Sequence, residues 1–338
     1  MSSKSRHELS SMERRRFVTT AIAAGAGLGI AGAQLLPKHA FLKDRRQKKS
    51  RVAVVSAAGY SDRLDELVLE ALRLFRLDIK GKSVLLKPNL VEHAPGSAIN
   101  THPIVVGAAA NAFLRLGACR VVVGEGPGHE RDTYLVLVET GLEEQLRTRK
   151  LRFVDLNRDE LIKRRTCVRY TGFEHLWLPQ TVLQADFIVS MPKVKTHHWA
   201  GVTLSMKNMF GVIPGVAYGW PKNVLHWRGI HESILDICST VPIHFVIADG
   251  IVAMEGNGPL HGSHRQLGKL ILADDPVAAD FTCCRLMGLR SEKVPHLATA
   301  AHWLGNGDAS RIDQLGEALP ARVRPFAVLP EFTGLVDI

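Results

Sequence analysis

The sequence predicts an α/β protein with a largely parallel, doubly wound, Rossmann-like sheet and helices on both of its faces. Three observations support this fold class. Short apolar runs rich in Val and Ile alternate with stretches in which apolar residues recur at helical spacing. The composition, with 46% hydrophobic and 22% charged residues, is that of a globular protein. Polar residues gather directly after the apolar runs, as they do at the carboxyl ends of parallel strands.

The elements follow one another in regular alternation. Strands are expected at 51–57, 83–88, 120–126, 151–156, 185–195, 243–250 and 269–274. Helices are expected at 62–75, 102–117, 231–239 and 275–288, with 202–210 as a further candidate. Such alternation favours a sheet that is covered on both faces. Residues 51–338 are therefore expected to form a single α/β domain.

The formal net charge of +10 is unevenly distributed. Residues 1–51 contain 12 Lys and Arg against 3 Asp and Glu, whereas residues 52–338 contain 31 against 30. The predicted folded part is therefore nearly neutral. Nucleic acid is not expected as a partner, because affinity for its phosphate backbone needs a concentrated basic face on the domain itself.

The first 33 residues resemble a twin-arginine signal peptide. Arg14 and Arg15 precede a weakly apolar stretch rich in Ala and Gly, and 31–33 is a small-x-small cleavage pattern. The resemblance implies handling by the twin-arginine translocase and a periplasmic or otherwise extracytoplasmic location. An uncleaved leader would instead anchor the protein to the membrane. Residues 34–50 read as a basic, solvated tether.

The five cysteines do not form a recognisable cofactor site. They are odd in number, they include no C-x-x-C, and they are expected to be mostly buried free thiols: Cys119, Cys167, Cys238, Cys283 and Cys284. An intrinsic iron–sulfur cluster is not expected, because clusters need closely spaced thiolates.

Polar residues that follow the predicted strands indicate one shared pocket at the carboxyl edge of the sheet. They are Lys87, Asn89, Glu125, Asp155, Lys193, Asp249 and Asp274. The alternative is that polar loops simply begin where strands end. No Walker loop, G-x-G-x-x-G, G-x-S-x-G or H-E-x-x-H motif is present, so a dinucleotide site is only weakly supported.

The segment 190–215 is the most informative. In an extended chain Lys193, Lys195 and His197 share one face, and a following turn would bring Lys207 towards it. Lysines near apolar residues need counter-charge, which is supplied either by protein carboxylates or by an anionic ligand. The alternative is a set of solvated surface lysines.

The segment 247–262 carries two carboxylates in a glycine-rich context. Asp249 and Glu255 could hold a cation, act as acid and base, or pair with the lysines. A divalent metal is one candidate cofactor, with His197, Asp249 and Glu255 as candidate ligands. The alternative is a structural turn with a capping Asp.

These segments resemble the family called domain of unknown function 362. The motifs are K-P-N-L-V at 87–91, T-H-P at 101–103, A-D-F-I-V-S-M-P-K-V-K-T-H, S-M-K-N-M-F-G and I-A-D-G-I-V-A-M-E-G-N-G-P, and the likeness covers about 52–290. Some members of that family are joined to ferredoxin modules with two four-iron clusters, and others carry twin-arginine leaders. This sequence lacks the cysteine-rich module.

The resemblance implies a set of site residues. Those carried over are Lys87, Asn89, His102, Glu125, Lys193, Lys195, His197, Lys207, Asn208, Asp249, Glu255 and Asp280. Lysines would hold a carboxylate or phosphate, and His197 would be the acid or base because its ordinary pKa lies near neutrality. We expect an exported protein that binds an anionic small molecule, as an enzyme whose reaction class stays open. The alternatives are a redox-associated protein with an iron–sulfur partner, and a non-catalytic ligand or metal carrier.

Overall fold

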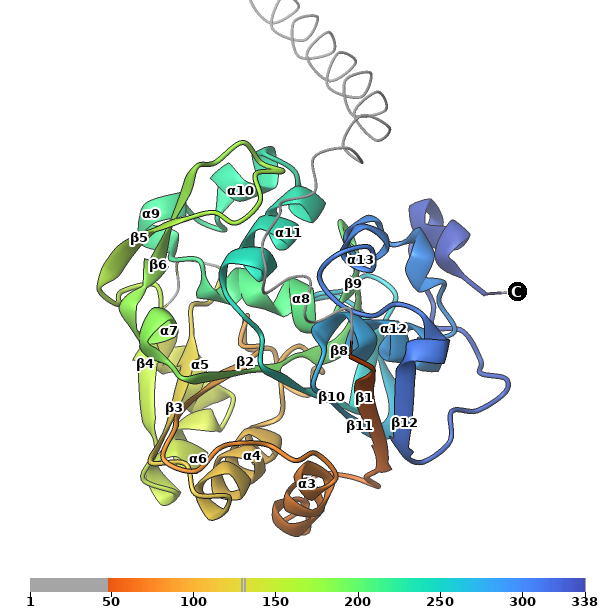
Figure 1. Ribbon diagram of the computed structural model, residues 1–338, viewed down its shortest axis with the longest axis horizontal. Helices are drawn as coiled ribbons and strands as arrows, with labels where there is room; N and C mark the ends of the chain where they lie inside the picture. Colours follow the sequence, from red (N-terminus) through yellow and green to blue (C-terminus); the bar gives the residue numbers. More distant parts are fainter. Residues whose placement is uncertain (1–47, 129, 131, 338) are drawn as a thin grey trace, which may run out of the picture. The chain divides into compact units, whose positions relative to one another are not determined.

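The computed structural model describes residues 48–128, 130 and 132–337 (Figure 1). The predicted leader at 1–33 and most of the predicted tether lie outside these residues. In the described part of the chain, no helix has the length and hydrophobicity that crossing a membrane requires. The described residues confirm the mixed α/β class, with a large, mostly parallel sheet between two layers of helices.

The central sheet joins strands from both ends of the described chain. Its order is β12 (Ile312–Gly316), β1 (Ser50–Ser56), β11 (Ser263–Ala273), β10 (Phe245–Glu255), β7 (Phe187–Met191), β2 (Ser83–Pro88), β3 (Arg120–Glu125) and β4 (Arg152–Asp155). From β10 to β4 every neighbouring pair is parallel, and so is the pair β1 and β12. Strand β11 is antiparallel to both of its neighbours.

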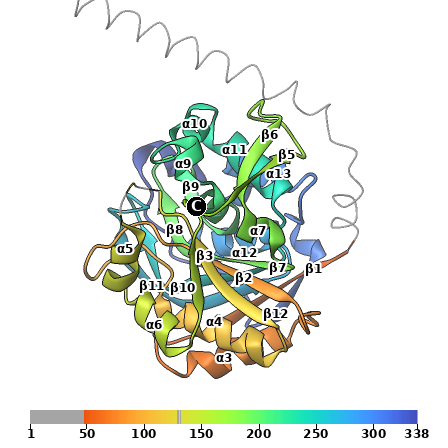
Figure 2. The same cartoon turned by 90° about the vertical axis from the view of Figure 1, so that its left-hand side faces the viewer.

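Helices cover the two faces of the sheet (Figures 1 and 2). One layer contains α3 (Leu64–Arg73), α4 (Pro103–Arg115), α5 (Thr133–Glu139) and α6 (Leu142–Thr148). The opposite layer contains α8 (Ser205–Asn208), α11 (Ile230–Thr240), α12 (Pro276–Met287) and α13 (Pro295–Ala300). Along β2, Val84 and Leu86 pack into the first layer and Leu85 into the second, as the period of two in a strand requires.

Smaller elements complete the second layer. They are the hairpin β5 (Leu161–Arg165) and β6 (His175–Pro179), α7 (Gln180–Gln184), α9 (Gly215–Tyr218), α10 (Asn223–Trp227), and the 3₁₀ helices η2 (Met209–Val212), η3 (Ser291–Lys293), η4 (Ala309–Arg311) and η5 (Pro330–Leu335). The hairpin was not among the expected strands, because its charged run 163–165 lacks an apolar pattern.

The two ends of α12 show how the local sequence determines where a helix begins and ends. The side chain of Asp275 accepts hydrogen bonds from the amides of Val277 and Ala278, at 2.8 and 3.2 Å, and Pro276 occupies the first turn of α12. Gly288, at φ 65°, ends that helix in the left-handed region that favours glycine. The expected helix at 275–288 is therefore confirmed almost to the residue.

The segment after β7 differs from the expectation of a strand that ends in a basic loop. After Pro192 the chain continues as β8 (Lys193–His197), which is buried throughout and pairs with the second half of β10. Strand β9 (Gly201–Thr203) then pairs with β8, so the candidate helix at 202–210 is reduced to the single turn α8 and the 3₁₀ turn η2. The antiparallel pairing of β9 with β8 outweighs the helical propensity at the start of this stretch.

The expected position of Asp274 at the carboxyl edge is wrong. Because β11 runs antiparallel to β10, its end lies at the opposite edge, where Asp274 accepts a hydrogen bond from the Arg51 side chain at 2.9 Å. Glu255 is the last residue of β10 rather than part of the glycine-rich loop that follows.

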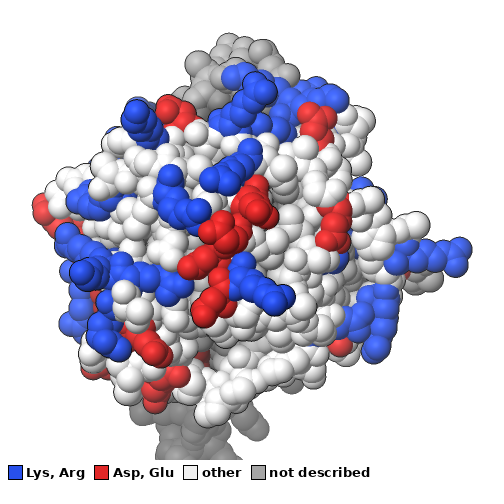
Figure 3. Space-filling model, turned by 90° about the horizontal axis from the view of Figure 1, so that it is seen from below, with Lys and Arg blue, Asp and Glu red and all other residues white. Residues whose placement is uncertain are grey.

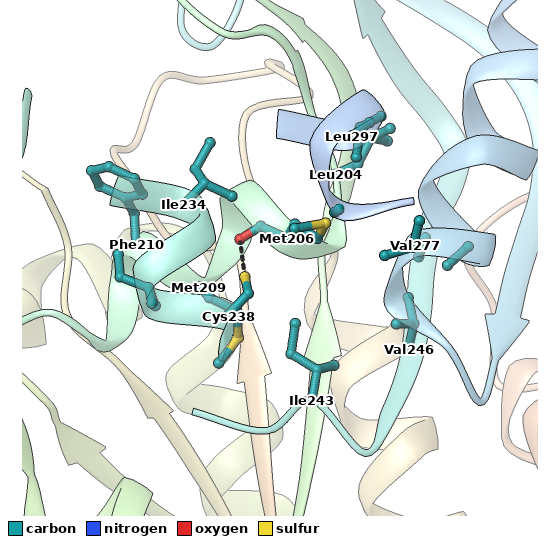
Figure 4. Packing of buried hydrophobic residues seen from close by; sticks show 14 of the residues in the cluster. Leu204, Met206, Met209, Phe210, Ile234, Cys238, Ile243, Val246, Val277 and Leu297 are labelled. Carbon is teal, nitrogen blue, oxygen red and sulfur yellow. Dashed lines mark hydrogen bonds between the residues drawn. The ribbon is translucent and has the colours of Figure 1, made fainter. Parts of the chain in front are cut away.

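The core beneath α8 is formed mainly by Met, Ile and Leu side chains (Figure 4). Met206, Met209, Ile234 and Ile243 belong to this core, and the Cys238 thiol donates a hydrogen bond to the Met206 carbonyl at 3.4 Å. A helix of one turn is not stable by itself in water. This packing therefore fixes the position of the two residues that α8 contributes to the cavity described below.

The outer face of the α3, α4 and α6 layer carries charges of both signs. Figure 3 shows Lys and Arg interspersed with Asp and Glu over this face.

All five cysteines are free, and three of them, Cys238, Cys283 and Cys284, are buried. Burial raises the pKa of the Cys283 and Cys284 thiols well above the ordinary value, which leaves them unreactive.

Candidate functional site

A cavity of about 340 Å³ lies where strands β2 and β3 end. Its wall also includes β8, α8, the segment that leads into α10, and the turn between β10 and β11. Of the sequence-predicted residues, seven line this cavity: Lys87, Asn89, Glu125, Lys195, His197, Lys207 and Asn208. The lining also includes residues that the sequence analysis did not select, above all Thr203, Lys222, His198 and His226.

Lys87 and Glu125 form a buried ion pair at the carboxyl ends of β2 and β3. The Lys87 ammonium also donates hydrogen bonds to the Pro88 carbonyl at 2.8 Å and to the Asn208 side chain at 3.1 Å. Asn208 in turn donates to the Lys87 carbonyl at 3.0 Å. Gly211 packs over the pair, and a Cβ there would lie 1.9 Å from a Glu125 carboxylate oxygen. This explains why a glycine follows K-N-M-F.

Lys195 is completely buried and has no carboxylate partner among the described residues. Its ammonium donates to the Ile99 carbonyl at 2.7 Å and approaches the Pro259 carbonyl at 3.4 Å. Burial, followed by the charge of Lys207, lowers the pKa of Lys195 well below its ordinary value.

Lys222 and Lys207 are two more lysines without a carboxylate partner in the described part of the chain. The Lys222 ammonium donates to the carbonyls of Gly126 and Phe210, at 2.7 and 3.1 Å. The Lys207 ammonium lies 4.2 Å from the centre of the Phe210 ring and makes no hydrogen bond to a described residue. Burial lowers the pKa of Lys222 to about 7 and that of Lys207 to about 8, and neighbouring ammonium groups contribute to both shifts.

The cavity therefore has an excess of lysines over carboxylates. Its described lining includes four lysines, Lys87, Lys195, Lys207 and Lys222, against the single carboxylate of Glu125. Only Lys87 is paired with that carboxylate. A protein normally pairs its buried charges.

Two buried polar groups of the lining lack a protein partner among the described residues. They are the Asn89 Oδ1 atom and the Thr203 hydroxyl. Nearly all buried polar groups in proteins are hydrogen-bonded to protein, water or ligand. These two atoms are therefore available to a molecule inside the cavity.

Hydrogen bonds fix the tautomer of His197. Its Nδ1 atom accepts from the amides of Trp199 and Ala200, at 3.0 and 3.2 Å, so the proton of the neutral ring is on Nε2. Burial and the Lys207 charge lower the pKa of His197 well below its ordinary value. At neutral pH His197 is an uncharged hydrogen-bond donor, and it does not titrate near neutrality as the sequence interpretation assumed.

His198 and His226 have the opposite tautomer. Each Nδ1 atom contacts a backbone carbonyl, that of Gly258 at 2.9 Å and that of Lys222 at 3.1 Å, and must therefore donate. In the neutral ring the lone pair is then on Nε2. Burial, reinforced by the Lys207 charge, lowers the pKa of His226 to about 4. The sequence shows these histidines as adjacent or paired residues but gives no spacing that places them together.

Comparison with known proteins identifies the family of this chain. Residues 84–285 match the domain of unknown function 362 (DUF362). The chain belongs to this family. It is also 29% identical over 228 residues to the thylakoid-associated protein sll1697 of Synechocystis, which covers 64% of this chain and 67% of that protein.

The DUF362 chain also has similarity to solved structures. It matches the lactate racemase apoprotein from Thermoanaerobacterium thermosaccharolyticum with a TM-score of 0.41 and 13% identity, over 63% of this chain and 52% of that one. A protein from Thermotoga maritima matches with a TM-score of 0.36 and 12% identity, over 68% and 59%. The chain thus spans between half and three fifths of these two proteins.

Three other predicted residues of the DUF362 chain form a separate ion network outside the cavity lining. Lys193 pairs with Asp249 at 2.8 Å, and the Tyr60 hydroxyl and the His102 amide donate to the same carboxylate at 3.0 and 2.9 Å. Asp249 also accepts from the Ile251 amide at 3.2 Å, so both of its oxygens are occupied. An irregularity in the β8–β10 pairing, between Asp249 and Met254, accompanies this separation of Lys193 from Lys195.

Glu255 and Asp280 also lie outside the cavity lining of this DUF362 protein. Glu255 accepts a hydrogen bond from the Ala327 amide at 3.2 Å, and Arg265 lies 3.9 Å from it. Asp280 accepts from the amides of Ser205 and Met206, at 2.8 and 3.0 Å, and so holds the start of α8.

The three candidate metal ligands, His197, Asp249 and Glu255, have different surroundings: His197 lines the cavity, Asp249 pairs with Lys193, and Glu255 lies near Arg265. Among the described residues no group of three or more His, Cys, Asp or Glu gathers as a metal site would require.

Proposed function

We propose that this DUF362 protein is exported, binds a small carboxylate or phosphate in the lysine-lined cavity, and acts on it as an enzyme. One observation carries the proposal: three of the four lysines in the described lining have no carboxylate partner. An anion that enters the cavity replaces the missing protein counter-charge, and hydrogen bonds between ammonium and oxyanion are about twice as strong as neutral ones.

The electrostatic balance argues against a purely structural role for these lysines. Two unit charges 4 Å apart interact by about 4 kcal/mol at the effective dielectric constant of about 20 that suits protein sites. In the Lys193–Asp249 pair the protein supplies the counter-charge itself. For Lys195, Lys207 and Lys222 it supplies only backbone carbonyls and an aromatic ring.

The unpartnered polar groups support the same proposal. The Thr203 hydroxyl can donate a hydrogen bond to an oxyanion, and Asn89 can bind a hydroxyl or amine elsewhere on the ligand. Trp199, Phe210 and Leu260 give part of the lining an apolar character. The cavity volume of about 340 Å³ lies in the range of small-molecule sites. We infer an anion with a short apolar or planar body.

The case for an enzyme rests on the acid–base groups that surround the anion site. His226 presents an unprotonated Nε2 atom, and two neighbouring lysines have lowered pKa values. Groups perturbed in this way concentrate in active sites, where protons must be transferred near neutral pH. For export, the support is the arginine pair and the cleavage pattern at 31–33.

Calorimetric titration tests the binding. Phosphate and a panel of small carboxylates should bind the wild-type chain, and Lys195→Ala or Lys207→Ala should weaken binding by roughly tenfold or more, about 1.4 kcal/mol. Lys163→Ala is the matched control, because Lys163 is exposed on β5 away from the cavity. Equal affinity in all variants would refute the site.

Turnover of the same anions distinguishes an enzyme from a carrier. The wild-type chain is incubated with each anion that binds, and loss of the anion is followed by mass spectrometry. Binding without loss of any anion would identify a non-catalytic carrier. A visible absorption spectrum of protein isolated from its native compartment would reveal a bound redox cofactor, if the redox-associated alternative holds.

A further inference from the structure

The four lysines of the cavity differ in what their amines contact. Lys87 has a carboxylate, an amide oxygen and a backbone carbonyl as acceptors, and Lys195 and Lys222 each have two backbone carbonyls. Such acceptors engage the protons on the nitrogen, so the amine is held in place even where burial lowers its pKa, as it does for Lys195 and Lys222. Lys207 has no acceptor among the described residues and contacts only the face of Phe210.

An amine can attack a carbonyl carbon only when its nitrogen has lost a proton and its lone pair is free. Lys207 meets the geometric condition, because the nitrogen breaks no hydrogen bond to a described residue when it turns towards a ligand. Its surroundings meet the electrostatic condition. Burial and the nearby Lys87 charge both disfavour the ammonium form, and they lower the pKa of Lys207 to about 8. A lysine desolvated beside another cation is a known way to activate an amine nucleophile.

We propose that Lys207 forms an imine with a 2-oxo carboxylate bound in this cavity, an inference that rests on the proposed anion site. The Lys207 nitrogen adds to the ketone or aldehyde carbon, and the carbonyl electron pair moves to oxygen, which takes up a proton. Loss of water from this carbinolamine then gives the imine. The reaction consumes one amine and one carbonyl and releases one water, so no oxidant or reductant is needed.

The cavity can accommodate the rest of this ligand. Lys195 and Lys222 are the lysines left to hold the carboxylate through their N–H groups, and a bound carboxylate favours their charged form. The neutral rings of His197 and His226 lie within the electrostatic influence of Lys207, since its charge lowers the pKa of both. His226 presents an unprotonated Nε2 that can accept a proton, and His197 presents an N–H that can donate one.

The test is reductive trapping on the full chain. Pyruvate or glyoxylate is added with sodium cyanoborohydride near neutral pH, and the adduct is located by peptide mapping. We expect Lys207 to be labelled roughly tenfold or more faster than exposed lysines such as Lys163, because its lowered pKa leaves far more free amine at that pH. Added phosphate should suppress the labelling of Lys207 and leave that of Lys163 unchanged.

Variants separate this inference from the function on which it rests. Lys207→Arg keeps a positive charge but has no amine that can form an imine, so it should abolish the single fast adduct. Lys163→Arg should change neither anion binding nor the adduct. If pyruvate binds by calorimetry but the adducts are spread over exposed lysines, the imine inference is refuted and anion binding stands. If neither pyruvate nor phosphate binds, both fail. Peptide mapping of the wild-type chain gives the answer even if the Lys207 variant does not fold.

Discussion

Replacing Glu125 by glutamine removes the only carboxylate from the described lining of the cavity and leaves Lys87 without its counter-charge. Lys87 is fully buried, so it must either stay charged without a partner or lose its proton. Losing the proton at pH 7, from an ordinary lysine pKa of about 10.4, costs about 1.4 kcal/mol per pH unit, or about 4.6 kcal/mol. Breaking a buried ion pair by removing one partner typically costs about 3–5 kcal/mol. We expect Glu125→Gln to lower the free energy of unfolding by that amount.

Phosphate should reverse part of this loss. An anion in the cavity supplies the negative charge that the variant lacks, so it should stabilise Glu125→Gln more than the wild type, by about 1.4 kcal/mol or more, a tenfold difference in affinity. Urea unfolding with and without phosphate measures both effects. The matched control is Glu66→Gln, which breaks the exposed ion pair with Arg115 and should cost less than about 1 kcal/mol.

Two results would refute this reasoning. If Glu125→Gln costs no more than Glu66→Gln, the buried pair does not carry the charge that the geometry implies. If the stability difference between variant and wild type is the same with and without phosphate, the anion does not bind beside Lys87.

Exchanging Arg14 and Arg15 for lysine is expected to hold the precursor in the cytoplasm, and normal export of the double variant in a fractionation experiment would contradict the leader assignment. Protein prepared without oxygen should contain no stoichiometric acid-labile sulfide in a colorimetric assay, since the chain has no C-x-x-C; about four sulfides per chain would overturn this. Sulfate affinity should fall as the pH rises from about 6 to about 9, because Lys222 and Lys207, with pKa values of about 7 and about 8, lose protons and hence positive charge over that range. Calorimetry at several pH values checks it, and a constant affinity up to pH about 10 would show that neither lysine titrates early. Asp249→Asn should lower the free energy of unfolding in urea by about 3–5 kcal/mol, because it breaks the buried pair with Lys193. It should leave sulfate affinity unchanged, because this pair lies outside the cavity lining, and a large loss of affinity would place the pair in the site.

Much of the fold follows from local patterns in the sequence. The alternation of apolar runs with helical periodicity predicts the parallel core from β2 to β10, and the capping residues around α12 predict its ends. What the patterns do not contain is strand direction. The run 269–274 has the same apolar pattern as the parallel strands, yet the short turn after Glu255 forces an antiparallel hairpin and carries Asp274 to the far edge.

The candidate site is predictable where polar residues end parallel strands, as Lys87 and Glu125 do. Alternation within an extended segment is a weaker guide. Alternation predicts that Lys193 and Lys195 share one face. In the structure the pairing of β8 with β10 is irregular, so Lys193 joins the ion network of Asp249 and Lys195 lines the cavity. Lys222 has no sequence signal of its own, because its placement depends on a left-handed backbone at φ 69° in an irregular segment.

The cavity wall is assembled from stretches of chain that lie far apart, from Lys87 on β2 to Leu260 in the turn before β11. A nascent chain cannot close the cavity until that last turn has been synthesised and has paired. The lysines come from segments that are far apart along the chain, so they repel one another strongly only once the cavity has formed. An anion that is present at that moment lowers the free energy of the completed fold relative to every earlier state. The concentration of the ligand during biosynthesis, and not only during function, would thus set how much of this protein matures.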